Sequence, residues 1–293
     1  MKIRGPIYFS LFAAALLLIA AYFPQFDSSE REAVLVQTLM SSLQRAHYSP
    51  LDLDNDFSEK VYDLYLNDLD MGRRFLTQED VKELKKYREE LDDQIRLGSL
   101  EFFDLAMQKL DAGMDKTQTW YQEILAQPFD FSVEEKAELK DEKDDFAADD
   151  AELREYWRKY LKYETLSRYS DKLEENEETG EEGENKSAET LEEEAREEVR
   201  DMFDKFFDRL NKLKRADRVS QFMNTVTSVF DPHTNYLQPI DKENFDITFS
   251  GRLEGIGARL MSEGDYTKVS DVVVGGRARF FHHKNITSVG ISL

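Results

Sequence analysis

Apolar residues recur at helical spacing along most of this chain, from Val36 to Phe230. Intervals of three and four residues place them on one face of each expected helix, and that face is buried against neighbouring helices. The pattern predicts a mainly α fold, with a helical N-terminal domain over residues 22–230. Periodicity and capping signals predict helix starts near Ser29, Asp56, Thr77, Leu100, Leu153 and Thr190, and a last helix that ends at Phe230.

The helix that starts at Thr77 is expected to run unbroken to Gly98. Two other parts of this domain lack a clear period. Residues 129–150 are ambiguous, because Phe129 and Phe131 alternate with polar residues while Ser132-Val133-Glu134-Glu135 could cap a short helix. Residues 170–190, above all those from Glu174 to Glu189, are rich in Glu and poor in apolar side chains. This composition predicts a mobile, solvated acidic loop.

The period changes after Phe230. Asp231-Pro232 cannot continue a helix, because proline lacks the amide hydrogen and disfavours the α conformation of the residue before it. Phe245, Ile247 and Phe249 then alternate with polar residues, so residues 231–250 are expected to form a connector and a first strand. Another strand is expected over residues 266–274, so a small β-containing domain is predicted to begin near residue 245.

Composition excludes several classes of function. The formal net charge of -22 opposes nucleic-acid binding, which needs a basic surface to displace counterions from phosphates. The absence of cysteine excludes disulfides, thiolate metal sites and a cysteine nucleophile. Only four histidines are present, so neither a histidine-rich metal site nor a complete Ser-His-Asp triad of the usual kind is expected.

The N-terminus predicts export. Lys2 and Arg4 precede an apolar run over residues 7–23, which is typical of a signal peptide. Cleavage after Ala21 would give a signal peptide over residues 1–21 and a mature chain beginning at Tyr22. The alternative is an uncleaved anchor that associates the protein with the inner membrane, because the run is close to the length of a spanning helix.

Three patterns in the sequence could belong to functional sites, but none of them marks a catalytic centre. Gly255 and Gly257 lack the third glycine and the acidic residue of a dinucleotide loop, so no cofactor is expected. Asp231 and His233 could ligate a metal, but a turn closed by Asp231 and Thr234 is the favoured interpretation. A Ser-Lys pair is not excluded by composition, although no local context marks a serine as a nucleophile.

A peptide-binding site is the remaining candidate. Glycines before a strand let consecutive backbone amides converge on a carboxylate, and the strand can then accept an extended peptide along its edge. An ordinary glycine-rich strand start is the alternative. The candidate peptide-binding residues are Gly255, Ile256, Gly257, Ala258, Arg259 and Leu260.

Several segments of the sequence resemble a known family, the tail-specific proteases, or C-terminal processing peptidases, of Gram-negative bacteria. The resemblance rests on His47-Tyr48-Ser49-Pro50, on residues 57–66, on Asp231-Pro232-His233-Thr234-Asn235-Tyr236-Leu237 and on Leu253-Glu254-Gly255-Ile256-Gly257-Ala258. It implies a periplasmic serine endopeptidase with a Ser-Lys dyad and a PDZ domain that captures unstructured apolar C-termini. It also suggests a helical-repeat lipoprotein adaptor as a partner.

The sequence departs from the family after Gly275-Gly276. The expected domains are therefore a partial PDZ domain over residues 251–276 and an aberrant tail over residues 277–293, which a frameshift or premature stop would explain. Because the family's dyad is then absent from these residues, the chain itself is expected to be an inactive, truncated tail-specific protease. The alternatives are a non-catalytic periplasmic peptide-binding or adaptor module and a purely structural helical protein.

Overall fold

The computed structural model describes residues 28–141, 144–179, 185–250, 258–263 and 266–272. Contacts divide the chain into two compact units, residues 1–236 and residues 237–293. The described part of the first unit is helical, and that of the second holds one helix and a strand pair, so the predicted mainly α fold is confirmed. In the first unit the helices are α2 (Ser28–Ala46), α3 (Asn55–Leu69), α4 (Gln78–Leu84), the short 3-10 helix η1 (Lys85–Tyr87), α5 (Leu91–Leu97), α6 (Glu101–Leu125), α7 (Asp150–Thr179), α8 (Ala188–Asn211) and α9 (Arg215–Phe230).

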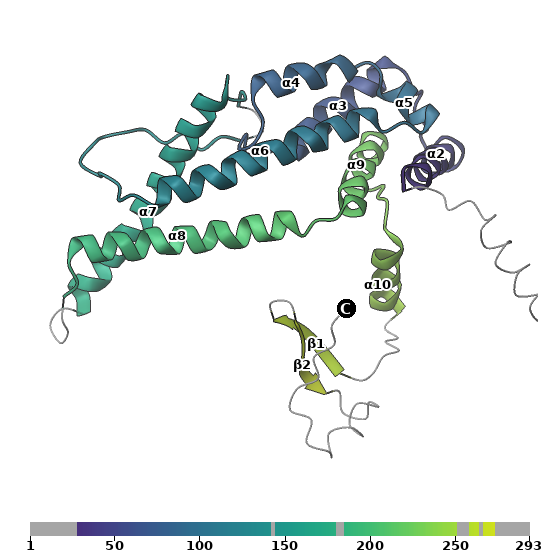
Figure 1. Cartoon of the computed structure of the whole chain (residues 1–293). Helices are drawn as coiled ribbons and strands as arrows, with labels where there is room; N and C mark the ends of the chain where they lie inside the picture. The colour runs from purple at the N-terminus through teal and green to yellow at the C-terminus, as the bar shows by residue number, and fades with distance from the viewer. Residues whose placement is uncertain (1–27, 142–143, 180–184, 251–257, 264–265, 273–293) are drawn as a thin grey trace, which may run out of the picture. The chain divides into compact units, whose positions relative to one another are not determined.

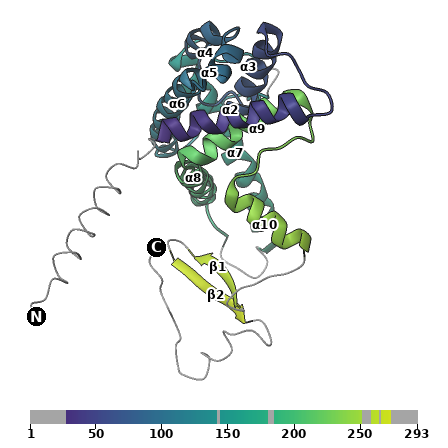
Figure 2. The ribbon, with the colours of Figure 1, turned by 90° about the vertical axis from the view of Figure 1, so that its right-hand side faces the viewer.

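Helix α6 lies in the middle of the first unit (Figure 1). At one end it packs among α3, α5 and α9, and at the other it packs against α7 and α8, which form an antiparallel pair. Figure 2 groups α3, α4 and α5 together and views α8 nearly end-on. The two ends of α6 therefore contribute to two separate apolar clusters.

The first cluster is built from α2, α3, α5, α6 and α9. Its largest side chains are aromatic, and Tyr65 packs edge-to-face on both Phe102 and Phe222, with ring centroids 5.6 and 5.0 Å apart. The second cluster joins α6, α7 and α8 around Trp157, whose indole nitrogen donates to the Arg74 carbonyl at 2.8 Å. Aromatic residues at helical spacing thus form the core, as the sequence indicated.

Several helix starts differ from the prediction by a few residues. The N-cap of α3 is Asp54, whose carboxylate accepts the Phe57 amide at 3.0 Å, rather than Asp56. The N-cap of α8 is Ser187 rather than Thr190. Thr77 is the N-cap of α4, at the expected start, and it forms a capping box with Asp80. These three caps are short polar side chains, so for them the residue type was right even where the position was not.

The helix expected from Thr77 to Gly98 is interrupted after η1, which the periodicity of Leu84 and Leu91 did not indicate. Two buried hydrogen bonds lie just after the interruption. The Ser58 hydroxyl accepts the Asp92 amide at 2.8 Å and donates to the Asp92 carboxylate at 2.7 Å. These bonds hold the start of α5 against α3. The C-terminal end was predicted correctly, because Gly98 adopts the left-handed conformation at φ 71°.

The acidic loop predicted over residues 170–190 is partly wrong, because α7 continues to Thr179. Glutamate is a good helix former, and exposed carboxylates remain hydrated on a helix as well as in a loop. Lys172 also binds Glu198 on α8 at 2.7 Å, and the Asn176 carboxamide bonds to the backbone of Lys186. Residues 180–184 lie outside the described part.

The second unit contains α10 (Pro239–Ser250), β1 (Ala258–Glu263) and β2 (Tyr266–Val272). The first strand predicted over residues 231–250 is wrong, because residues 239–250 are helical. Phe245 and Phe249 are four residues apart, a spacing that fits a helix face as well as alternation does, and their rings stack with centroids 5.9 Å apart. Five residues were too few to separate the two periods.

Candidate functional site

The strand pair of the second unit holds the described part of the predicted peptide-binding site. Ala258, Arg259 and Leu260 open β1, whereas Gly255, Ile256 and Gly257 lie outside the described residues. Strands β1 and β2 are antiparallel, with Ala258 opposite Val272 and Leu260 opposite Val269. The register is irregular between Arg259 and Leu260, as in a β-bulge, which bends the strand locally.

Within the described residues, one edge of β1 has no strand beside it. In the part of the chain that the structure describes, β1 pairs with β2 alone. Leu260 and Val269, which are register partners, expose 52% and 54% of their surface, and Met261 exposes 52%. A strand with unpaired backbone groups and exposed apolar side chains can accept an extended peptide by main-chain hydrogen bonding.

Asp231 closes a local turn, as predicted. Its carboxylate accepts the His233 amide at 3.0 Å, and its carbonyl accepts the Thr234 amide at 3.0 Å. Among the described residues there is no group of three or more histidine, aspartate or glutamate side chains that could hold a metal ion. The metal-ligand interpretation of Asp231 and His233 therefore has no third ligand within that part of the chain.

The histidine that contacts this turn is His47, which sequence reasoning did not connect to it. His47 Nε2 lies 3.4 Å from the Thr234 hydroxyl and 4.0 Å from the Asp231 carboxylate. His47 and the turn at Asp231 belong to two motifs that carry the family resemblance, and the two motifs are separated by more than 180 positions in the sequence. Only their joint membership of those motifs could have indicated the contact.

A buried carboxylate organises the turn between α3 and α4. The side chain of Asp70 accepts three backbone amides, those of Arg74, Phe75 and Leu76, at 2.8 to 2.9 Å. Burial raises the pKa of this carboxyl above its ordinary value, although the three amides and the Arg73 guanidinium oppose that shift. Because all of its partners belong to one turn, Asp70 has a structural role.

Arg73 completes the same turn in a backbone conformation that is unusual for a residue with a side chain, at φ 50°. Its guanidinium donates to the Asp70 carbonyl at 3.0 Å and to Asn67 at 2.7 Å, and it lies over the Phe146 ring. These contacts tie the segment before α7 to the turn after α3. No substrate-facing group is evident among these side chains.

A groove of about 340 Å³ lies between the end of α6, the following loop and α7. The Glu135 carboxylate binds both the Arg158 guanidinium and the Lys162 ammonium group, which is 2.7 Å away. These two bonds, with Arg158 contributing most, lower the pKa of Glu135 to about 2. The ion pairs of Glu135 with Arg158 and Lys162 therefore form one side of the groove. The apolar lining of the groove is Ile124, Pro128, Phe129 and Val133.

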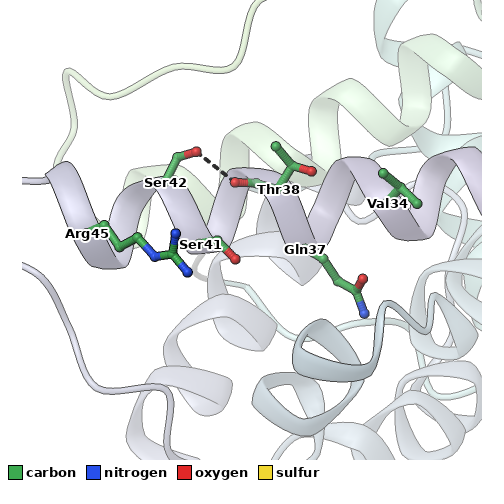
Figure 3. A pocket seen from close by; sticks show the side chains of 6 residues that line it. All are labelled: Val34, Gln37, Thr38, Ser41, Ser42 and Arg45. Atoms are coloured by element: carbon green, nitrogen blue, oxygen red, sulfur yellow. Dashed lines mark hydrogen bonds between the residues drawn. The ribbon is translucent and has the colours of Figure 1, made fainter.

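A second depression, of about 370 Å³, lies on the outer face of α2 (Figure 3). All of its lining residues come from this one helix, and the Ser42 hydroxyl is already bonded to the Thr38 carbonyl at 2.8 Å. A single helix face supplies no opposite wall, so the depression holds no converging set of reactive groups. Its lining residues are Val34, Gln37, Thr38, Ser41, Ser42 and Arg45.

Comparison with known proteins decides the family. The family model described as the tail-specific protease N-terminal domain matches residues 39–240, which is more than half of the chain. The chain belongs to this family. The matched range covers almost all of the described first unit, so the helical architecture described above is that of the tail-specific protease N-terminal domain, and the resemblance seen in the sequence is confirmed.

A longer relative supports the same assignment. The tail-specific protease of Haemophilus influenzae is 26% identical to this chain over 255 residues, an alignment that covers 85% of this chain and 34% of the relative. The chain thus spans about a third of the length of this relative. Among the described residues, no helix is both long and apolar enough to cross a membrane.

Proposed function

We propose that this chain supplies the helical domain and the peptide-capturing strand of a serine protease that processes the C-termini of exported proteins. The family assignment supports proteolysis as the setting. The observation that carries the capture role is β1, which pairs on one side only within the described residues and begins with Ala258, Arg259 and Leu260. The occupant is an extended, apolar C-terminal peptide.

Capture would use two kinds of contact. The peptide backbone would add to the free edge of β1 as a further strand, about 4.8 Å away. Its terminal carboxylate would bind the backbone amides that precede the strand, at Gly255, Ile256 and Gly257. Leu260 would then contact an apolar peptide side chain directly, whereas Val269 lies one strand further from the peptide.

Peptide binding with matched variants tests this proposal. We expect a fluorescent peptide with an apolar, free C-terminus to bind the chain, and the same peptide with an amidated C-terminus to bind about tenfold more weakly. Leu260→Asp should weaken binding by about tenfold, because it places a charge against the apolar peptide. Val269→Asp is the control, since Val269 is the register partner of Leu260 and is equally exposed. Equal affinities for the two variants would reject β1 as the site.

We infer further that the helical domain itself is not the catalytic part of the protease. Its buried polar side chains, such as Asp70, Ser58 and Asp92, are bonded to neighbouring turns and helices and hold the fold together. Purified chain is therefore expected not to cleave an unfolded substrate with an apolar tail. Cleavage that a single serine substitution within residues 28–250 abolishes would contradict this inference.

Export to the periplasm is part of the same proposal. It rests on Lys2, Arg4 and the apolar run over residues 7–23, which lie outside the described residues. A periplasmic location would bring the domain to the exported proteins whose C-termini it helps to process. The helical-repeat lipoprotein adaptor suggested by the resemblance remains a proposed partner, and co-purification from periplasmic extract tests it.

A further inference from the structure

Two motifs that resemble the family, residues 47–50 and residues 231–237, contact each other at His47, Asp231 and Thr234. They come from the end of α2 and from the segment that follows α9. Neither motif contributes to the candidate peptide site. The first compact unit ends at Tyr236, within the second motif.

His47 is the fixed half of this contact. Its ring is packed edge-to-face against Phe230, with centroids 5.7 Å apart, and its side chain is only 7% exposed. Nδ1 lies 2.8 Å from the Ser49 carbonyl oxygen. Nδ1 also lies 3.2 Å from the Ser49 amide nitrogen, and Nε2 lies 3.4 Å from the Thr234 hydroxyl, so both ring nitrogens face polar partners.

The segment from Asp231 to Tyr236 is held at three further points. The Asp231 carboxylate lies 4.0 Å from His47 and closes its own turn by accepting the His233 amide. The Tyr236 amide donates to the Asn224 side chain at 2.7 Å, across twelve positions of the sequence. The Tyr236 ring packs on the first apolar cluster. The segment therefore folds back along α9 instead of leaving it freely.

We propose that these contacts form a clasp, defined by His47, Asn224, Asp231, Thr234 and Tyr236, that fixes where the chain leaves the first unit. With the clasp closed, the chain is held against the first unit as far as Tyr236. With the clasp open, it is held only as far as Phe230, the last residue of α9. The six residues so released would extend the connection by up to about 20 Å.

Hydrogen exchange with paired variants tests the clasp. Asn224→Ala should raise the exchange rate of the Tyr236 amide by about fivefold or more, as expected for the loss of one hydrogen bond. Asn224→Asp keeps the acceptor oxygen and should restore the parent rate. His47→Phe keeps the ring contact with Phe230 but removes both nitrogens, so it should raise exchange at His233 and Thr234. Thr234→Val tests the same bond if His47→Phe fails to fold.

The control is His233→Ala, because this side chain is exposed and lies in the same turn. It should leave exchange across residues 233–236 unchanged. Faster exchange confined to residues 231–236 supports the clasp. Exchange in that segment that stays at the parent rate in both Asn224→Ala and Thr234→Val, or that rises equally throughout α9, would overturn it.

A distance measurement tests the consequence for the connection. The chain has no cysteine, so Ser167→Cys in the first unit and Met261→Cys in the second can be labelled selectively. We expect the distribution of distances between the two labels to broaden in Thr234→Val and in Asn224→Ala, and to stay at the parent width in His233→Ala. An unchanged width in the clasp variants would show that the exit point is set elsewhere.

Discussion

Gly113 in α6 lies directly against the backbone of Phe75, in the turn that precedes α4. A Cβ at position 113 would overlap the Phe75 carbonyl oxygen and come within 2.9 Å of its carbonyl carbon and 3.2 Å of its Cβ. The glycine therefore has a packing role in the middle of a long helix, at a position where helix propensity alone would favour alanine.

Gly113→Ala is accordingly expected to destabilise the domain. Propensity would add up to about 1 kcal/mol of stability. The overlap with backbone forces α6 and the turn apart, and we expect the free energy of unfolding to fall by about 1–3 kcal/mol overall. Urea unfolding measures the difference, with Asp111→Ala on the exposed face of the same helix as a control. A stabilised Gly113→Ala variant would show that the turn yields easily.

Asp70→Asn should also destabilise the first unit. The carboxylate accepts amides on both oxygens, Arg74 on one and Phe75 and Leu76 on the other. An asparagine has one acceptor oxygen, so its NH2 group would face at least one backbone donor. We expect a loss of about 1–3 kcal/mol in the free energy of unfolding.

The matched change for Asp70→Asn is Asp63→Asn, which removes an exposed carboxylate that binds Arg88. An exposed ion pair contributes about 1 kcal/mol or less. If both variants lose the same stability, the buried position of Asp70 has no special energetic weight.

The ion pairs of Glu135 with Arg158 and Lys162 predict that the stability of the loop after α6 depends on pH. The pKa of Glu135 is lowered from 4.5 to about 2 by Arg158 and Lys162. A carboxyl with a depressed folded-state pKa stabilises the bound arrangement above pH 4.5, and that contribution is lost as the pH falls toward 2. The protection of the loop amides after α6, measured against the intrinsic exchange rate at each pH, should therefore fall over this interval.

Glu135→Gln removes the titrating carboxyl group from these ion pairs. In this variant, the protection of the loop amides should already be low at neutral pH and should change less between pH 5 and pH 2 than in the parent chain. Loop exchange with the same pH profile in parent and variant would assign the dependence to another carboxylate.

The N-terminal residues predict processing during export. We expect mature protein from a periplasmic fraction to begin near Tyr22, because the apolar run ends with small residues that a signal peptidase accepts. N-terminal sequencing or intact mass measures this directly. Protein that retains Met1 in a cytosolic fraction would contradict the expectation, and protein that retains it in the membrane fraction would indicate an uncleaved anchor.

Much of the helical domain could be predicted from the sequence, because amphipathic periodicity is a local property. Val36, Met40 and Phe222 are buried as their spacing indicated, and Thr77 caps α4 as expected. The break before α5 could not be predicted, since it depends on Ser58, which lies more than 30 residues away from Asp92.

The candidate site shows the same division. A strand after the glycines at 255–257 and another over residues 266–274 were expected from local patterns, and β1 and β2 lie there. The α10 residues were misassigned because Phe245 and Phe249 satisfy both periods over a short run. The contact between His47 and Thr234 depends on the folded arrangement of α2 and α9, which no local pattern contains.

The position of α6 in both apolar clusters bears on how the domain unfolds. Phe102, Phe103 and Ala106 belong to one cluster, Leu110, Tyr121 and Leu125 belong to the other, and Met107 packs against both. Melting one end of this helix would expose side chains at the boundary of the other cluster. The two halves are thus thermodynamically coupled, and the first unit should lose its structure in a single cooperative transition instead of two successive ones.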